Sequence, residues 1–345
     1  MAATSEPERR SRARALVEGL QARHVGRREA FSRGAGSPTT FQAVSWNRDG
    51  GRHGGGTRLQ TAGGAFDRAS VNVSCVHYDD VPERALSSAT ALSAIAHPAH
   101  PRAPSLHLHV SWTARKDGQA YWRIMADLNP SIPDPRQTER FRAAVAAAAG
   151  DRWAQGRDNG DRYFHIPALE RHRGVCHFYL EGLDSGDFEA DRSLGEAVET
   201  AVIDTYATLI TEAVDAAGPP TEADRAAQLA YHTVYLFQVL TMDRGTTSGL
   251  LVHGDNDVGI LGSLPSRVDR ALLASWRHRV PTVQAPLVDA LAAALAPGPR
   301  SPVDDPTKRR LAAAVRAHYR AHPDALALQA RGDVLPPTVA NHQPR

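Results

Sequence analysis

Between residues 70 and 183 the sequence contains four segments in which apolar and polar residues alternate, and they constrain the fold more than any other feature. The segments are SVNVSCVHY (70–78), LHLHVSW (106–112), QAYWRIMADL (119–128) and GVCHFYLEGL (174–183). An alternation with period two is typical of a β-strand whose two faces meet different surroundings. We therefore expect each segment to form a strand that sends alternate side chains to the two faces of a sheet.

Apolar residues at helical spacing mark a second set of segments. The clearest is 193–218, in which apolar residues recur every four positions from Val198 to Val214. Further helices are predicted over 138–154, 221–232, 287–296 and 308–322, and a further strand over 235–242. Strands therefore come in neighbouring groups with long helices between the groups. This order favours an α+β fold with a mainly antiparallel sheet over a regular alternation of strands and helices.

The composition argues against several classes of partner. The 345 residues include 40 Lys and Arg against 38 Asp and Glu, a formal net charge of +2, so no basic excess points to nucleic acid. No apolar run is long enough to span a bilayer, and the stretch MAATSEPERRSRAR lacks the apolar core of a secretory signal. The two cysteines cannot form a disulfide framework. These features predict a cytoplasmic protein without a membrane span.

The chain divides into three predicted parts. Residues 1–40 form a polar arm and an Arg-rich helix, residues 41–297 form the main domain, and residues 298–345 form a helical extension and tail. The glycine-rich segment 50–66 matches neither a dinucleotide-binding nor a phosphate-binding motif, so its spacing predicts a flexible loop. The last residues, 332–345, are predicted to be frayed.

Two histidines, His107 and His109, lie two residues apart in the segment LHLHVSW. On a strand this spacing places both imidazoles on the same face of the sheet. One interpretation is a strand face with one hydrogen-bonded and one half-exposed histidine. Another is a metal site, because two or three histidines and a carboxylate are a common ligand set for iron or zinc.

Five groups of segments, in the same order, resemble the oxygen-dependent coproporphyrinogen III oxidase family between residues 45 and 266. They are GGGTRL with AFDRASVNVS, AIAHPAHPRAPSLHLHV, MADLNP, RGVCHFYLE, and MDRGTTSGL with SLP. The resemblance implies a large antiparallel sheet flanked by helices on both faces, usually in a homodimer. It also implies an oxidative decarboxylation with molecular oxygen as the co-substrate, without a metal or an organic cofactor.

The resemblance assigns roles to particular residues of this chain. Asp127 of ADLNP and His107 are predicted to be catalytic, with the buried carboxylate engaging the pyrrole N–H groups of a porphyrinogen. A carboxylate held against N–H donors in a closed site can act as a base or as an electrostatic partner. The residues predicted to bind substrate are Ser74, Arg58, His109, Arg173, His177 and Arg244. Arginine suits this role because its planar fork matches a carboxylate.

The sequence also departs from the family pattern. The family strand reads His-x-Asn-x-Arg, whereas this chain has His107, His109 and Ser111. The glycines before Ala-Asp-Leu are replaced by the bulkier residues 123–125, and a further arginine is lost within ALER (168–171). A substrate with four carboxylates needs several cations to offset its desolvation. The losses predict a less acidic, electron-rich aromatic or heteroaromatic substrate in a specialised pathway.

We therefore expect an oxygen-dependent oxidase or oxidative decarboxylase that uses no organic cofactor and binds a small aromatic molecule. Three alternatives stay open: a genuine coproporphyrinogen III oxidase of haem biosynthesis, a metal-dependent oxygenase that uses His107, His109 and His177, and a non-catalytic binding protein for a tetrapyrrole or another aromatic ligand. Retention of Asp127 favours an enzyme over a binding protein, because a pure binder has little use for a buried carboxylate.

Overall fold

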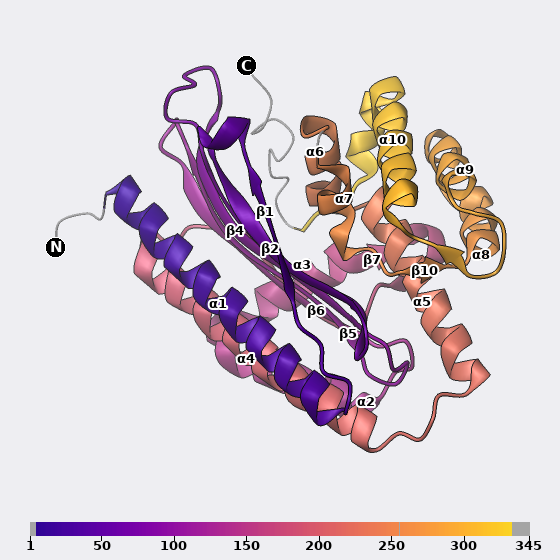
Figure 1. Ribbon diagram of the computed structural model, residues 1–345. Helices are drawn as coiled ribbons and strands as arrows, with labels where there is room; N and C mark the ends of the chain where they lie inside the picture. Colours follow the sequence, from indigo (N-terminus) through magenta and orange to yellow (C-terminus); the bar gives the residue numbers. More distant parts are fainter. Residues whose placement is uncertain (1–4, 255, 333–345) are drawn as a thin grey trace.

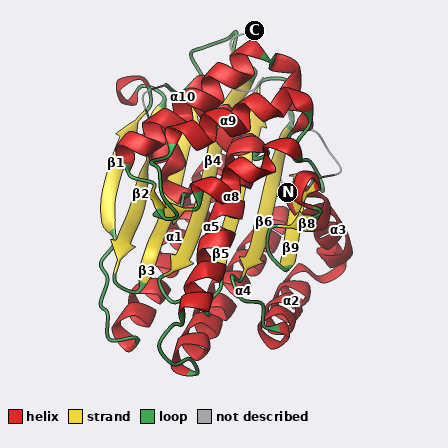
Figure 2. Cartoon of the chain, turned by 90° about the vertical axis from the view of Figure 1, so that its right-hand side faces the viewer, coloured by secondary structure: helices red, strands yellow, loops and turns green. Residues whose placement is uncertain are grey.

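The computed structural model describes residues 5–254 and 256–332. Its centre is a seven-stranded sheet in the order β1-β2-β3-β4-β5-β6-β9, and every neighbouring pair in it is antiparallel. Helices cover both faces of this sheet (Figures 1 and 2), which confirms the predicted fold class. The strands are β1 (Gln42–Asn47), β2 (Gly54–Gly63), β3 (Phe66–His77), β4 (Leu86–Pro98), β5 (Ser105–Arg115), β6 (Ala120–Asn129) and β9 (Cys176–Leu183).

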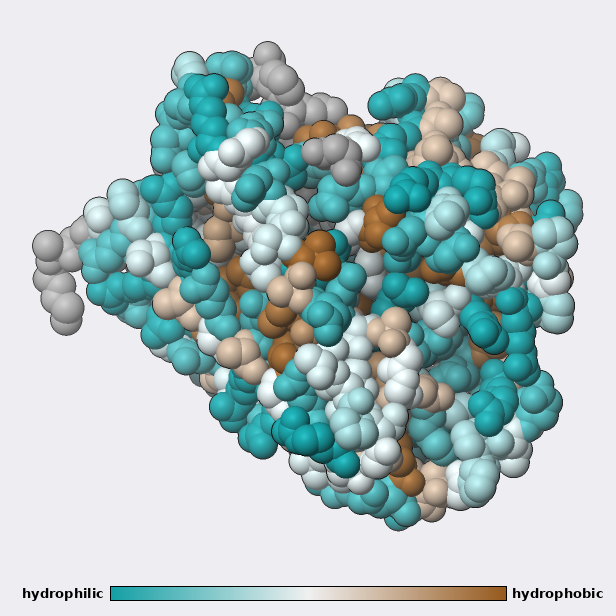
Figure 3. Space-filling view, viewed as in Figure 1, coloured by the Kyte–Doolittle hydropathy of each residue, from teal (hydrophilic) through white to brown (hydrophobic). Residues whose placement is uncertain are grey.

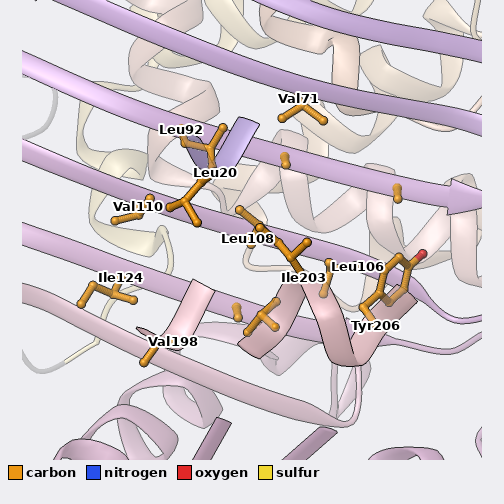
Figure 4. Close-up of a cluster of buried hydrophobic side chains, with 14 of the residues drawn as sticks. Leu20, Val71, Leu92, Leu106, Leu108, Val110, Ile124, Val198, Ile203 and Tyr206 are labelled. Carbon is orange, nitrogen blue, oxygen red and sulfur yellow. The ribbon is translucent and has the colours of Figure 1, made fainter. Parts of the chain in front are cut away.

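One face of the sheet is apolar and carries two long helices, α1 (Glu6–Gly34) and α4 (Phe188–Asp215). Alternate residues of β3 to β6 point to this face, and they are buried Val, Leu, Ile and Ala side chains. Figure 4 shows how they pack against Leu20 of α1 and against Val198 and Tyr206 of α4. Burial of one Val, Leu or Ile side chain contributes about 1.5–3 kcal/mol. This layer therefore fixes which residues of each strand face the helices.

The other face of the sheet carries a layer of shorter helices from the second half of the chain (Figure 2). Their apolar side chains form a second buried cluster around the end of α5, which includes Leu236, Phe237 and Leu240. The helices of this layer are α5 (Glu222–Thr241), α6 (Arg244–Val252), α7 (Asp257–Ile260), α8 (Arg270–Ser275), α9 (Ala285–Ala294) and α10 (Asp305–Ala321).

Two further helices, α2 (Pro135–Ala149) and α3 (Trp153–Phe164), connect β6 to β9. Helix α3 approaches β9 so closely at Gly156 and Gly160 that an added Cβ atom would collide with the Phe178 ring at the first position. At the second position it would lie 2.7 Å from the Cβ atom of His177. Two short ladders complete the described chain: β7 (His165–Ile166) with β8 (Arg171–His172), and β10 (Arg267–Val268) with β11 (Ser301–Pro302).

The prediction of a flexible loop over residues 50–66 is wrong. Most of this segment is β2, which lies inside the sheet between β1 and β3. Glycine is needed there because the neighbouring backbones come very close. A Cβ atom at Gly55 would collide with the carbonyl oxygen of Trp46, and one at Gly56 with that of Val73. The glycines therefore serve close strand packing and not loop flexibility.

The predicted strand over 235–242 is also wrong, because residues 235–241 complete α5. They are buried on all sides between the sheet and the outer helices, so their sequence lacks the polar positions that reveal a helix. The four predicted strands between residues 70 and 183 are confirmed, and so are the predicted helices, although 138–154 is divided between α2 and α3. Strands β1 and β4 were not predicted from the sequence. Strand β4 is rich in Ala and Ser, whose small side chains give little contrast between apolar and polar positions.

The two predicted terminal segments both pack against the central region. The buried side of α1, which includes Ala13 and Val17, belongs to the core beneath the sheet. Helix α10 packs on α9 in the second apolar cluster. The boundaries at residues 40 and 297 stay a prediction, and residues 333–345 of the predicted tail lie outside the described residues. Within the described chain, no helix is long and apolar enough to cross a membrane.

We expect Gly156→Ala to destabilise the protein although alanine favours a helix. The added methyl group meets the Phe178 ring, so α3 must move away from β9. Overpacking of this kind costs about 1–3 kcal/mol. Urea unfolding followed by circular dichroism measures the change.

Gly26→Ala in α1 is the matched control for this variant. An added Cβ atom there meets nothing within 4 Å, so only the helix propensity changes. This control should gain up to about 1 kcal/mol. A gain of the same size for Gly156→Ala would contradict the close packing of α3 on β9.

Candidate active site

A cavity of about 380 Å³ lies between the sheet and the helical layer. Its floor comes from β2 to β6, and its roof comes from α5, α6, α7 and the turns between them. In the view of Figure 3 the surface is largely hydrophilic, and apolar side chains gather in the middle, where the sheet meets the helical layer. A concave site of this size between two layers suits a small ligand.

Every second residue of the strands points into the cavity, and many of these residues are polar, although Ala89, Ala91, Ile95 and Met125 are not. The residues between them face α1 and α4 and are apolar. The alternation that predicted the strands thus separates a structural face from a ligand face. The floor includes Arg58 of β2, Ser70, Asn72 and Ser74 of β3, Ser93 of β4, His107, His109 and Ser111 of β5, and Arg123 of β6.

Asp127 is the centre of a buried network beside this floor. Its Oδ2 accepts hydrogen bonds from Arg173 Nη2 (2.7 Å) and Nε (3.2 Å) and from Asn129 Nδ2 (2.6 Å). Its Oδ1 accepts a hydrogen bond from His107 Nδ1 (2.7 Å). Arg173 also donates to Gln238 Oε1 of α5 (2.7 Å), so the network joins the sheet to the helical layer.

The carboxylate of Asp127 is ionised but lies behind the cavity wall. Burial alone would raise the pKa of Asp127, yet Arg173 and His107 outweigh this effect and hold the pKa below its usual value. The side chain is 0% exposed and is absent from the described residues that line the cavity. A ligand in the cavity therefore meets Asp127 only through its neighbours.

His107 is the neighbour that connects Asp127 to the cavity. Its imidazole lines the cavity, and 17% of the side chain is exposed. An ionised carboxylate only accepts hydrogen bonds, so we assign the shared proton to His107 Nδ1. This leaves Nε2 as the ring nitrogen that can meet a ligand, while Asp127 holds the tautomer and the ring orientation.

His109 also belongs to the floor, two residues further along β5. Its Nδ1 and Nε2 lie 3.0 Å from Ser93 Oγ and 3.0 Å from Ser111 Oγ, respectively. Burial, followed by the charges of Arg123 and His107, lowers the pKa of His109 well below its usual value. His109 is therefore a neutral hydrogen-bonding group at physiological pH.

Arg58 is a buried cation whose charge is offset only in part, by Asp305 beyond ion-pair distance. It lines the cavity and is 6% exposed, and no ion pair joins it to a carboxylate of the described residues. Its Nε has no hydrogen-bond partner, and burial lowers the pKa of its guanidinium. An unpaired cation out of water is unfavourable, so an anion that enters the cavity would stabilise Arg58.

Arg123 is a cavity residue whose charge the sequence analysis did not connect with binding. Strand pairing places it directly opposite Ser111, the position at which the family pattern has an arginine. Its Nη2 donates to Glu181 Oε1 of β9 (2.6 Å). The sequence does show an arginine among the residues 123–125 that replace the family's glycines. Its position opposite Ser111 follows only from the register of β5 and β6. The neighbouring strand therefore places a guanidinium opposite Ser111.

The predicted binding residues are only partly brought together. Arg58, Ser74, His107, His109 and Arg173 line the cavity. Two others do not: the His177 ring hydrogen-bonds Asp161 Oδ1 (2.8 Å) and the Arg173 carbonyl oxygen (2.7 Å), and the Arg244 guanidinium approaches the Ala330 carbonyl oxygen (3.4 Å).

The alternative metal site has no geometric basis in the described structure. His107 Nδ1 is bound to Asp127, and the two ring nitrogens of His109 are bound to serines. His177 makes its hydrogen bonds outside the cavity. Across residues 5–254 and 256–332, no group of three or more His, Cys, Asp or Glu side chains is arranged to hold a metal ion.

The C-terminal helix shapes the roof of the cavity. Arg316 of α10 donates to the carbonyl oxygens of Leu250 (2.5 Å) and His253 (3.2 Å) and to Asp257 Oδ2 (2.9 Å). These contacts hold the end of α6 beside the start of α7, and His253 itself lines the cavity. The predicted extension after residue 297 therefore takes part in the site.

Comparison with known proteins finds a match to the coproporphyrinogen III oxidase family over residues 12–290. The chain belongs to this family. The oxygen-dependent coproporphyrinogen-III oxidase of Rickettsia akari (strain Hartford) is 30% identical over 246 residues, which are 67% of this chain and 85% of the relative. That of Rickettsia bellii (strain OSU 85-389) is 30% identical over 256 residues, 70% of this chain and 89% of the relative. Helix α10 follows the matched residues.

Membership of the coproporphyrinogen III oxidase family confirms the resemblance and the predicted class, an oxidoreductase that uses molecular oxygen. Such oxygen-dependent enzymes need no organic cofactor. These relatives do not support the predicted substrate, an aromatic molecule other than coproporphyrinogen in a specialised pathway, and the alternative of a genuine coproporphyrinogen III oxidase fits them better. The homodimer and the cytoplasmic location stay predictions.

We expect His109→Asn to reduce the loss of stability on acidification. The folded protein keeps His109 neutral, whereas the unfolded chain binds a proton there below about pH 6.5. Stability is therefore lost as the pH falls below that value, and His109 accounts for about 1 kcal/mol of the loss between pH 7.0 and 5.5. Urea unfolding of both proteins at the two pH values measures the difference. An equal loss in both proteins would show that His109 is protonated in the folded state.

Proposed function

We propose that this chain is an oxygen-dependent oxidase that converts propionate side chains of a porphyrinogen into vinyl groups, with coproporphyrinogen III as the first candidate. The relatives support this substrate class. Arg58 is the observation that carries the proposal, because a buried cation that no ion pair of the described residues neutralises, in a cavity, calls for an anionic ligand. Arg48 and Arg123 add two further guanidinium groups to the cavity wall.

The chemistry needs binding, orientation and one proton transfer from the protein. Each turnover follows R–CH2–CH2–COO⁻ + H⁺ + O2 → R–CH=CH2 + CO2 + H2O2. The propionate loses two electrons, and one O2 accepts them together with two protons. The arginines of the cavity would hold carboxylates, and the roof would limit the access of water to the reacting ring.

His107 is the residue that we propose for proton transfer. Its Nε2 is free of Asp127 and belongs to the side chain that lines the cavity. Asp127 acts through His107 as a positioning residue, because it keeps the proton on Nδ1 and stabilises the imidazolium. This role differs from the direct contact with pyrrole N–H groups that the resemblance implied, since Asp127 has no exposed surface.

Purified protein in air should convert coproporphyrinogen III into vinyl products, with one O2 consumed per vinyl group. Chromatography of the porphyrins after chemical oxidation, together with an oxygen electrode, measures both quantities.

Arg58→Met should raise KM about 10-fold or more, because a hydrogen bond to a charged group is worth about 1.5–3 kcal/mol. Binding without oxygen consumption would favour the non-catalytic binding protein, and the absence of both would refute the proposal.

Asp127→Asn should lower kcat about 100-fold or more, since general acid–base catalysis contributes at least that factor. The same variant leaves Arg173 without its counter-charge, which costs about 3–5 kcal/mol of stability. Both kcat and urea unfolding are therefore needed. Gly156→Ala serves as the control for lost stability, because Gly156 lies outside the cavity lining. Wild-type kcat in a folded Asp127→Asn variant would end the proposed role.

A further inference from the structure

Ser111 of β5 and Arg123 of β6 form one cross-strand pair in the cavity floor. The register joins them directly, so both side chains project from the same face of the sheet. Both belong to the residues that line the cavity. A serine side chain is short, so the pair leaves room for the long side chain of Arg123 and presents a single guanidinium to a ligand.

The guanidinium of Arg123 is held from one side and has donors left on the other. Its Nη2 donates to Glu181 Oε1 at 2.6 Å, and its Nε is buried without a hydrogen-bond partner. The side chain keeps 16% of its surface exposed, whereas that of Glu181 is almost completely buried. A guanidinium carries five N–H donors in a planar fork. One bond to Glu181 therefore fixes its orientation and leaves N–H groups for a second carboxylate.

The surroundings of Arg123 suit a carboxylate. Its neighbour His109 is neutral and its two ring nitrogens are bound to Ser93 and Ser111, so it places no second charge beside Arg123. Glu181 neutralises the charge of Arg123 but is absent from the described cavity lining. Recognition at this point therefore depends on the geometry of the N–H fork at short range and not on long-range attraction.

We propose that Arg123 is a specificity-determining residue that binds one propionate carboxylate of the substrate, an inference that rests on the proposed porphyrinogen activity. The guanidinium that the family pattern places at position 111 is supplied here from position 123. Adjacent strands lie about 4.8 Å apart, so the carboxylate anchor moves by one strand toward β9. Relative to the family pattern, the arginine is therefore lost at position 111 on β5 and gained at position 123 on β6, so that the cavity keeps one guanidinium at this place.

The test compares variants that differ only in this guanidinium. Arg123→Met alone would leave Glu181 buried and unpaired, so Glu181→Gln is the reference and Arg123→Met/Glu181→Gln is its partner. The probe is coproporphyrin III, the stable oxidised form of the substrate, and its Kd is measured by quenching of porphyrin fluorescence. Loss of Arg123 should raise Kd about 10-fold or more relative to Glu181→Gln. The tetramethyl ester of the same porphyrin should show no such difference, because it carries no anionic group.

A rescue variant distinguishes an exchange of anchors from a general effect of cavity shape. Ser111→Arg/Arg123→Gly/Glu181→Gln should bring Kd back to within about 3-fold of the reference if the two positions share one carboxylate site. Equal affinity of the reference and Arg123→Met/Glu181→Gln for the tetra-acid would overturn the inference, and so would an equal loss for the ester.

The same experiments separate this inference from the proposed function. A wild-type protein that neither binds coproporphyrin III nor consumes oxygen with coproporphyrinogen III would remove both. A wild-type protein that does both, together with an Arg123 variant that binds as tightly as its reference, would remove the role of Arg123 and leave the proposed activity in place.

Discussion

The buried ion pair between Asp127 and Arg173 is the interaction on which the candidate site depends. Both groups are removed from water, so each is tolerable only with the other and with the added hydrogen bonds from Asn129 and Gln238. The pair connects β6 to the segment before β9 and to α5, so it fixes the spacing between the sheet and its roof. It also holds His107 in one tautomer. The buried ion pair of Asp127 and Arg173 therefore positions His107, the side chain that faces the cavity.

One face of the sheet packs against helices and the other lines the cavity, and this difference explains which strands could be predicted from the sequence. In β3, β5, β6 and β9 large apolar residues facing α1 and α4 alternate with polar residues of the other face, so their period is plain. In β2 and β4 many positions are filled by Gly, Ala and Ser, whose small side chains carry little apolar signal. The end of α5 fails for the opposite reason, because a helix buried all round has no polar stripe.

The sequence indicated which residues lie near the cavity, but not which of them have side chains exposed to it. The family motifs pointed to Arg58, Ser74, His107, His109 and Arg173, and the structure places these residues around one cavity. No sequence pattern states that Asp127 lies one layer behind His107, because that depends on which side chain the fold leaves in front. His177 shares the face of Asp127 by register, yet its ring turns to Asp161 and leaves the cavity. Side-chain direction within a shared face is set by packing, which the sequence alone does not contain.

The acidity of the substrate is a property of the cavity and not of aligned positions. Counting the arginines that are missing from family positions predicted a less acidic ligand, but a carboxylate responds to guanidinium groups within a few ångströms, whatever strand supplies them. Arg123 stands across the ladder from the vacated position, and Arg58 and Arg48 bring cations from β2 and the turn after β1. Carboxylates weaken the positive field of these arginines: Glu181, which is bound to Arg123, Asp243, which lines the roof, and Asp305, whose charge acts on Arg58. Because no ion pair of the described residues neutralises Arg58, the proposed activity would use it as the main anion site, with Arg123 acting at shorter range. Arg316 of α10 keeps the roof above them in place.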